Sequence, residues 1–537
     1  MNNRNYNIFF HLHTVSGITI TVGLFIIFFG GAFALFRQEI GEWESGKYED
    51  KKRAAVKSEK TDYNRILDSI EKNVPSLYGR NVYVYSEGTS DKQAVYISGS
   101  EDPKTDSLGK LAYEYEVNPE NYTLMSHESS FSLGELLYLL HFYYQLDRIG
   151  YYISGLVALF FFLAIVTGIL VHWQKIRSNF FVFRPRQKLK TVWTDAHTAL
   201  GVIGLPFQFI YALTGSMFGL GIVVAGSNAL WIYNGDTEKM YDDVIRETTS
   251  ADTLGKKQTY VVDYNKLVAE TAGKWPDFKV DRLHIAFYGS QTMKVEVSGS
   301  ESIRERFLGQ GSVTFKAETG KELQARAPGN MGYYDDVWSS VRRLHYAQFG
   351  DIGTFSTYFL KIIYFLMAFL TCFVIISGVL IWLEARNKKN ITEKKRRYNE
   401  LVGAIYLAIC LSMLPITAAS FILSKVLPET LSGSRESILN YSFFLGWLVL
   451  SIVLSWKRNK GLTNKFCLLT GGILGLIIPV VNGVSSGNWF WRTFSQGEYG
   501  IFSVDIIWLC IGIICLLVVK RLRKNGVEIP ASVAGVR

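Results

Sequence analysis

"HTVSG" (His13–Gly17) and "HTALG" (His197–Gly201) are near-copies of one pentapeptide, and each opens a long apolar stretch. The 537 residues include only eight histidines, so two of them in matched positions need an explanation. Each copy continues through an apolar stretch and a long polar segment to another histidine, in "HFYYQLDRIG" (141–150) or "HYAQFGDIG" (345–353). A second apolar stretch follows in both copies, so the sequence predicts a duplicated unit of span, polar segment, histidine and span.

The hydropathy pattern identifies the class of protein. Apolar residues make up 48% of the chain and gather in runs that polar blocks separate. A bilayer core needs roughly 20 apolar residues in a helix. The runs that qualify lie at about 8–36, 149–173, 199–226, 355–384, 400–424, 437–456, 466–485 and 501–519. The sequence predicts an α-helical polytopic membrane protein of about eight transmembrane helices, in which the duplicated spans form a four-helix core.

The distribution of charge gives the orientation. Lysine and arginine gather in the connections 173–196 and 385–400, in the turn after residue 456 and in the C-terminal tail. The positive-inside rule places these regions in the cytoplasm, so we expect both termini there. This topology accounts for most of the net charge of +10, and no nucleic-acid partner is expected. All five cysteines lie in expected spans, which excludes a disulfide framework in the outside segments.

The same topology divides the chain into six parts. Residues 37–148 and 227–354 are expected outside the membrane, each as a small α+β module. Modules of this size favour a scaffold, docking or regulatory role over an independent enzyme. The other parts are span one at 1–36, spans two and three with a basic loop at 149–226, span four with its loop at 355–399, and a four-span bundle with the tail at 400–537.

The four repeated histidines fall at two depths. His13 and His197 begin spans one and three on the inner side, and His141 and His345 precede spans two and four on the outer side. A parallel repeat has a pseudo-two-fold axis along the membrane normal, so His13 should face His197 and His141 should face His345. Two imidazoles are too few for a structural zinc, but they supply both axial ligands of a haem. The sequence predicts two haems that transfer electrons; the alternative is that each histidine is an ordinary interfacial residue.

Glycines recur at the same depths as the histidines. A helix without a side chain at that level lets a flat macrocycle lie against it, and the alternative is generic close packing of membrane helices. The inner-level glycines are Gly17, Gly201, Gly168 and Gly378, and the outer-level glycines are Gly30, Gly31 and Gly215.

Other polar residues near the two levels are weaker candidates for the haem sites. Arginines could bind the haem propionates, and ordinary surface charge is the alternative for each. They are Arg342 and Arg343 at the outer level, and Arg184 and Arg186 at the inner level. His172 and His11 lie close to the inner level, where either could support or replace a ligand.

Three stretches carry a family resemblance: "HLHTVSGI" (11–18), "FFVFRPRQKLKTVWTDAHTALGVIGLPFQFIYALTG" (180–215) and "ISGVLIWLEAR" (376–386). They resemble the PepSY-associated transmembrane proteins of bacterial inner membranes, and the closest branch is similar to siderophore-iron reductases. The resemblance implies PepSY-like outside domains and haem b ligation by the four repeated histidines. It also implies that a cytoplasmic or quinol donor supplies electrons that reduce a ferric siderophore at the outer face. The outside segments diverge from each other, so the resemblance does not specify the siderophore.

Aromatic residues before span four are candidates for docking the substrate, and an interfacial aromatic belt is the alternative. They are Tyr333, Tyr334, Trp338 and Tyr346.

Two other functions compete with the reductase. A transporter of siderophores or ions is disfavoured because the spans are expected to lack broken helices and buried charges, and Lys361 is expected to reach the outer interface. A non-enzymatic regulator of envelope proteins is favoured by outside modules that have no catalytic constellation of their own.

Overall fold

The structure is a computed structural model of the 537-residue chain. It describes residues 2–46, 61–85, 93–118, 121–126, 131–173, 176, 182, 184, 187–237, 239–240, 253–301, 307–349, 355–387, 390–428 and 432–524. Within these residues, eight helices are long and apolar enough to cross a membrane, which confirms a multi-pass protein. They are α1 (Asn3–Ala34), α6 (Asp147–His172), α8 (Leu189–Trp231), α12 (Phe355–Arg386), α13 (Glu393–Val426), α14 (Ser432–Trp456), α15 (Lys460–Ser486) and α17 (Tyr499–Lys524).

The third span is much longer than its hydropathy predicts. Helix α8 has 43 residues, and at 1.5 Å per residue it is about 65 Å long, roughly twice the thickness of a bilayer core. Its polar first turn and its exposed outer end at Trp231 therefore extend beyond the apolar run at 199–226. Hydropathy identifies only the apolar part of α8, whereas the helix also includes polar residues before that part.

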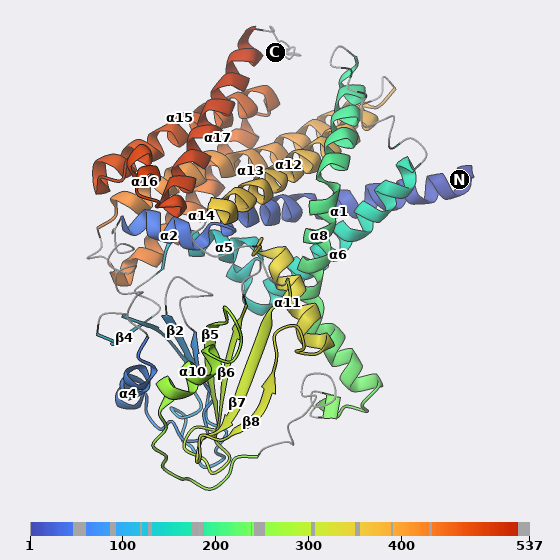
Figure 1. Cartoon of the computed structure of the whole chain (residues 1–537). Coiled ribbons are helices and arrows are strands. Elements are labelled where there is room, and N and C mark those ends of the chain that lie inside the picture. The colour runs from blue at the N-terminus through green and yellow to red at the C-terminus, as the bar shows by residue number, and fades with distance from the viewer. Residues whose placement is uncertain are drawn as a thin grey trace.

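The duplicated spans form one bundle. Helix α1 packs against α6 and α12, and α8 packs against the same two helices, so each of the four has two neighbours. The last four long helices form a second bundle, in which α13 packs against α14 and α15, and α15 against α17. Figure 1 shows the second bundle beside the first.

One antiparallel sheet of eight strands lies on one side of the bundles (Figure 1). Its strand order is β4-β3-β2-β1-β5-β6-β7-β8. The first outside segment supplies β1 (Val82–Tyr85), β2 (Gln93–Ile97), β3 (Tyr113–Val117) and β4 (Leu124–Ser126). The second supplies β5 (Lys279–Ala286), β6 (Lys294–Ser300), β7 (Gln310–Lys316) and β8 (Glu322–Arg326).

The two segments are joined through the β1–β5 pair, where Val82 lies opposite Ile285 and Tyr85 opposite Arg282. The sequence predicts two separate modules, whereas the structure has one shared sheet. Side chains alternate between faces in a strand, and the apolar face packs against α4 (Tyr63–Asn73) and α10 (Tyr264–Ala272). Because the strands of both segments pair, both segments must lie on the same side of any membrane.

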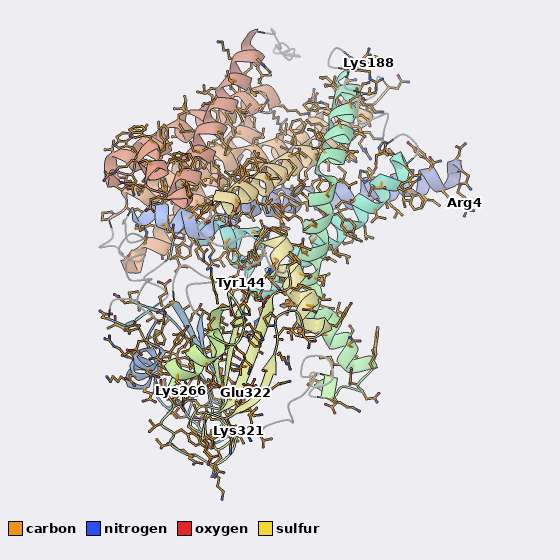
Figure 2. The ribbon with its side chains drawn as sticks, in the orientation of Figure 1. Arg4, Tyr144, Lys188, Lys266, Lys321 and Glu322 are labelled. Carbon is orange, nitrogen blue, oxygen red and sulfur yellow. The ribbon has the colours of Figure 1, made fainter. Side chains whose placement is uncertain are left out.

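Short helices connect the sheet to the bundles. They are α2 (Arg37–Ser45), α5 (Leu133–His141), the 3-10 helix η2 (Tyr144–Leu146) and α11 (Tyr333–His345), whereas α16 (Phe490–Ser495) joins α15 to α17. Helices α5 and α11 each end on a histidine of the duplicated pattern. Figure 2 shows Tyr144 between the sheet and the bundles, whereas Arg4 and Lys188 lie far from the sheet.

Candidate functional site

The inner histidines come together from two helices that are far apart in the sequence. The ring centroids of His13 on α1 and His197 on α8 are 6.2 Å apart, and the ring planes are at 71°. The Nδ1 of His13 is 2.8 Å from the carbonyl oxygen of Ala164 on α6. The Nδ1 of His197 is 2.9 Å from the carbonyl oxygen of Val374 on α12 and 3.2 Å from the Oγ of Ser377.

The outer histidines form a similar pair. The ring centroids of His141 and His345 are 5.9 Å apart, with the planes at 45°. The Nδ1 of His141 is 2.7 Å from the carbonyl oxygen of Ile27 on α1. The Nδ1 of His345 is 2.8 Å from the Oγ1 of Thr214 on α8, and that hydroxyl donates its own proton to the carbonyl of Ile210.

These bonds fix the chemical form of all four imidazoles. A carbonyl oxygen can only accept, so the Nδ1 of His13, His141 and His197 carries the proton. Thr214 already donates to a carbonyl, so His345 also donates from Nδ1. In the neutral ring the Nε2 then has its lone pair available, and this is the tautomer that binds a metal.

Three of the seven glycines at the two levels provide room for the imidazole rings. A Cβ at Gly31 would lie 2.6 Å from the Nδ1 of His141. At Gly168 a Cβ would lie 3.1 Å from His13 Cε1, and at Gly378 3.2 Å from His197 Cε1. Each of these glycines follows by four residues the carbonyl that its histidine binds, so one helical turn both accepts the Nδ1 proton and leaves space for the ring.

Gly17 and Gly201 differ from the ring-contacting glycines. Within the described part of the chain, no atom outside their own helical backbone lies within 4 Å of a Cβ built at either position. Both lie one turn after an inner histidine on the same helix face. The helix surface next to the His13–His197 pair is therefore open.

The spacing of the two pairs fits a haem. A transition metal bound by two imidazole nitrogens at roughly 2 Å each holds the ring centres about 6 Å apart. The observed separations are 6.2 and 5.9 Å. Within the described residues, no group of three or more His, Cys, Asp or Glu side chains could hold a metal ion. A macrocycle that brings its own four nitrogen ligands needs only such a pair.

Two buried polar atoms between the levels lack partners among the described atoms. The hydroxyl of Tyr143 reaches into the bundle, where a Cβ at Gly23 would lie 2.5 Å from it, and it accepts and donates no hydrogen bond. The Nε2 of Gln208 on α8 is also buried and unpaired. Buried polar groups are nearly always hydrogen-bonded, so these two donors indicate that a polar group of a ligand, or water, belongs there.

The outer arginines face the sheet. Arg343 donates to the carbonyl of Phe307, and Arg342 interacts electrostatically with Asp281 at the start of β5. Burial, together with the charge of Arg342, lowers the pKa of Arg343. Burial raises the pKa of Asp281, although Arg282 and Arg342 oppose the effect. These residues join α11 to the sheet, and the structure does not direct the two arginines toward the histidine pair.

The four aromatic candidates separate into two pairs. Tyr333 and Tyr334, at the start of α11, are 85% and 37% exposed. Trp338 packs on Phe218 with centroids 5.3 Å apart, and Tyr346 packs on both Phe218 and His345. The first pair is the more accessible to a molecule from outside, whereas the second pair packs on Phe218, and Tyr346 also contacts the outer histidine.

The weaker candidates at the inner level also differ in their surroundings. His172 lies one turn after Gly168 and interacts electrostatically with His13, whereas His11 is exposed. Arg184 forms a two-pronged ion pair with the buried Asp195, its Nε and terminal nitrogen lying 2.9 and 2.8 Å from the carboxylate oxygens. This ion pair therefore attaches the basic connection to α8. Arg186 lies outside the described residues.

The expectation that the spans lack buried charges is wrong, whereas the eight long helices are each continuous among the described residues, as expected. Prolines lie inside α8, α13 and α15. Asp505 in α17 is fully buried, and Lys361 pairs with the buried Glu39 of α2 instead of reaching the interface. Hydropathy missed these charges because each is a single polar residue in a strongly apolar run.

Comparisons with known proteins agree with this architecture. The model of the family "PepSY-associated TM region" matches residues 10–385, a range that includes all four paired histidines and both outside segments. A Pseudomonas aeruginosa protein named "Uncharacterized protein PA4219" is 23% identical over 224 residues, which are 41% of this chain and 56% of that protein. The match thus spans little more than half the length of this relative. The chain belongs to the PepSY-associated TM region family.

Proposed function

We propose that this protein is a di-haem b oxidoreductase that passes electrons across a bacterial inner membrane to a ferric siderophore at the outer face. One observation carries the proposal. Two histidine pairs, 6.2 and 5.9 Å apart between ring centroids, lie at opposite ends of one apolar bundle with every Nδ1 bonded and every Nε2 available. Filling both axial positions favours electron transfer over oxygen binding.

The protein's own residues have three tasks in this function. The carbonyls of Ala164, Val374 and Ile27 and the hydroxyl of Thr214 hold the four imidazoles in one orientation. When bound, each haem supplies one-electron redox chemistry at a fixed depth. The apolar bundle keeps water from the path, and its aromatic side chains fill the interval between the pairs; Phe28, for example, packs on Phe161 and Tyr211 at 5.2 and 5.7 Å.

The depth of the two pairs suits transfer across a bilayer. Gly31, which touches His141, follows His13 on α1 by 18 residues, or about 27 Å at 1.5 Å per residue. This is close to the roughly 30 Å thickness of the hydrocarbon core. A cytoplasmic or quinol donor would meet the His13–His197 pair, and the acceptor would meet the His141–His345 pair on the side of the sheet.

A ferric siderophore is the acceptor that the chemistry favours. Reduction to Fe(II) lowers the charge on the metal and weakens its hold on hard oxygen ligands, so iron leaves without breakage of the chelator. The exposed Tyr333 and Tyr334 at the start of α11 would contact the chelate. A transporter is the second candidate, since α13 and α15 both contain a proline and a buried aspartate lies beside them.

Purified protein from haem-replete cells should be red, with about two haems per chain. The dithionite-reduced minus oxidised spectrum should have the narrow bands of low-spin b-type haem, because both axial positions are filled. In vesicles with a reductant inside, a ferric chelate outside should be reduced, as followed by trapping of Fe(II). A colourless protein would contradict the proposal and favour the transporter or the regulator of envelope proteins.

A further inference from the structure

Helix α2 buries two carboxylates. Glu39 and Glu44 are 3% and 8% exposed and lie beside the buried Ile40 and Trp43. The helix follows α1 directly and packs against both α5 and α17 (Figure 1). Burying charges is costly unless each is paired, so the partners of these carboxylates show what α2 holds together.

Glu44 connects the second bundle to the helix that carries His141. One carboxylate oxygen, Oε2, accepts a 2.8 Å hydrogen bond from the backbone nitrogen of Leu133, the first residue of α5. The other, Oε1, accepts from the guanidinium of Arg435 on α14, whose Nε lies 3.1 Å away. Arg435 also donates to the carbonyls of Leu427 and Ser424 at the end of α13.

Three further contacts hold the rest of α2. Glu39 pairs with Lys361 of α12. The indole nitrogen of Trp43 donates to Asp505 of α17 at 2.8 Å, and Lys425 of α13 donates to the Trp43 carbonyl. The network therefore contains three carboxylates and three cations, drawn from α2 and from spans four, five, six and eight.

The network is close enough to act on the outer histidine pair. Helix α5 runs from Leu133 to His141, so Glu44 is about 12 Å from the ligand by helical rise. Charges in a low-dielectric interior interact appreciably at this distance. A charge fixed at Glu44 can therefore change the energy of adding an electron to the outer site, while the inner pair lies about 27 Å further away along α1.

We propose that the α2 network positions His141 through α5 and sets the reduction potential of the outer haem. This gives the C-terminal bundle a function, because Arg435, Lys425 and Asp505 all belong to it. The inference rests on the proposed function. Glu44 and Arg435 are positioning residues, since neither touches the histidine pair in the structure.

The test is a redox titration of Glu44→Gln and Arg435→Gln, with the inner haem as internal control. Removal of the carboxylate's negative charge favours the reduced form, so E44Q should raise the midpoint potential of the outer haem. R435Q should lower it, and the double variant, which is again neutral, should return close to wild type. Arg397→Gln is the matched control because its pair with Glu393 is exposed and lies at the start of α13, whereas the network contacts the end of that helix.

Opposite shifts confined to one haem would support the inference, because a merely loosened bundle moves both variants in the same direction. Shifts of equal sign, equal shifts at both haems, or no shift would overturn it. Hydrogen exchange is a readout that needs no haem: Glu44→Ala should speed exchange of the amides in the first turn of α5, and R397Q should not. Protein that binds no haem contradicts the proposed function, whereas unchanged exchange contradicts the positioning role itself.

Discussion

His345→Ala is expected to remove one of the two haems and stop reduction of the external ferric chelate. The variant deletes one axial ligand of the outer pair and leaves His13 and His197 untouched. Loss of a residue that only orients a ligand typically costs about 10–100-fold in affinity or activity, so loss of the ligand itself should lower the rate by more than about 100-fold. Haem content should fall from about two to about one per chain.

The inner haem provides the decisive control for this variant. It should still be reduced by a donor added on the cytoplasmic side, with its bands unchanged, since only the later step is interrupted. His11→Ala is the matched substitution, because His11 is exposed and should leave both haems in place. If H345A keeps two haems and the wild-type rate, the pairing of His141 with His345 is not the haem site.

Gly31→Ala should displace His141 although it changes only one methyl group. The new Cβ would lie 2.6 Å from Nδ1 and 2.7 Å from Cε1 of the ring, and contacts this short cannot persist. The ring must move away from α1, which breaks the 2.7 Å bond to the Ile27 carbonyl. We expect a loss of about 1–3 kcal/mol of stability from overpacking, and a haem affinity of the outer site lowered by roughly 10–100-fold.

Gly221→Ala on α8 is the control for the glycine experiment, because no described atom lies within 4 Å of a Cβ there. Haem stoichiometry and the potential of each haem distinguish the two variants. G31A should lose haem only from the outer site, and G221A should retain both haems and the wild-type melting temperature. Full outer occupancy in G31A would show that the close approach of α1 to His141 has no role in binding.

The sequence predicts the membrane part of the fold well because its signals are local. Twenty apolar residues in a row specify a span regardless of the rest of the chain. The duplication adds long-range information, since matched pentapeptides imply matched depths, and the structure brings together the same two histidine pairs. The ends of α8 were underestimated because its helix continues through polar residues.

The rest depends on contacts between distant parts of the chain. The β1–β5 pair joins residues about 200 positions apart, and neither strand carries a mark of its partner. Glu44 and Arg435 are separated by 391 positions, and each is an ordinary surface residue by its local sequence. The hydroxyl of Tyr143 points into the bundle, although the residue lies next to the outer end of a span in the sequence. Hydropathy does not predict which way a side chain points after a short helix.

The shared sheet has a consequence for biosynthesis. After β1 is synthesised, roughly 200 further residues must be added before its partner β5 is complete. At about 5–20 residues per second this takes about 10–40 s. During this interval the backbone donors and acceptors along one side of β1 are an unprotected edge, open to pairing with a wrong chain. Synthesis of the second segment ends the exposure, so a nascent chain arrested after the third span and before β5 should bind chaperones that the finished protein no longer needs.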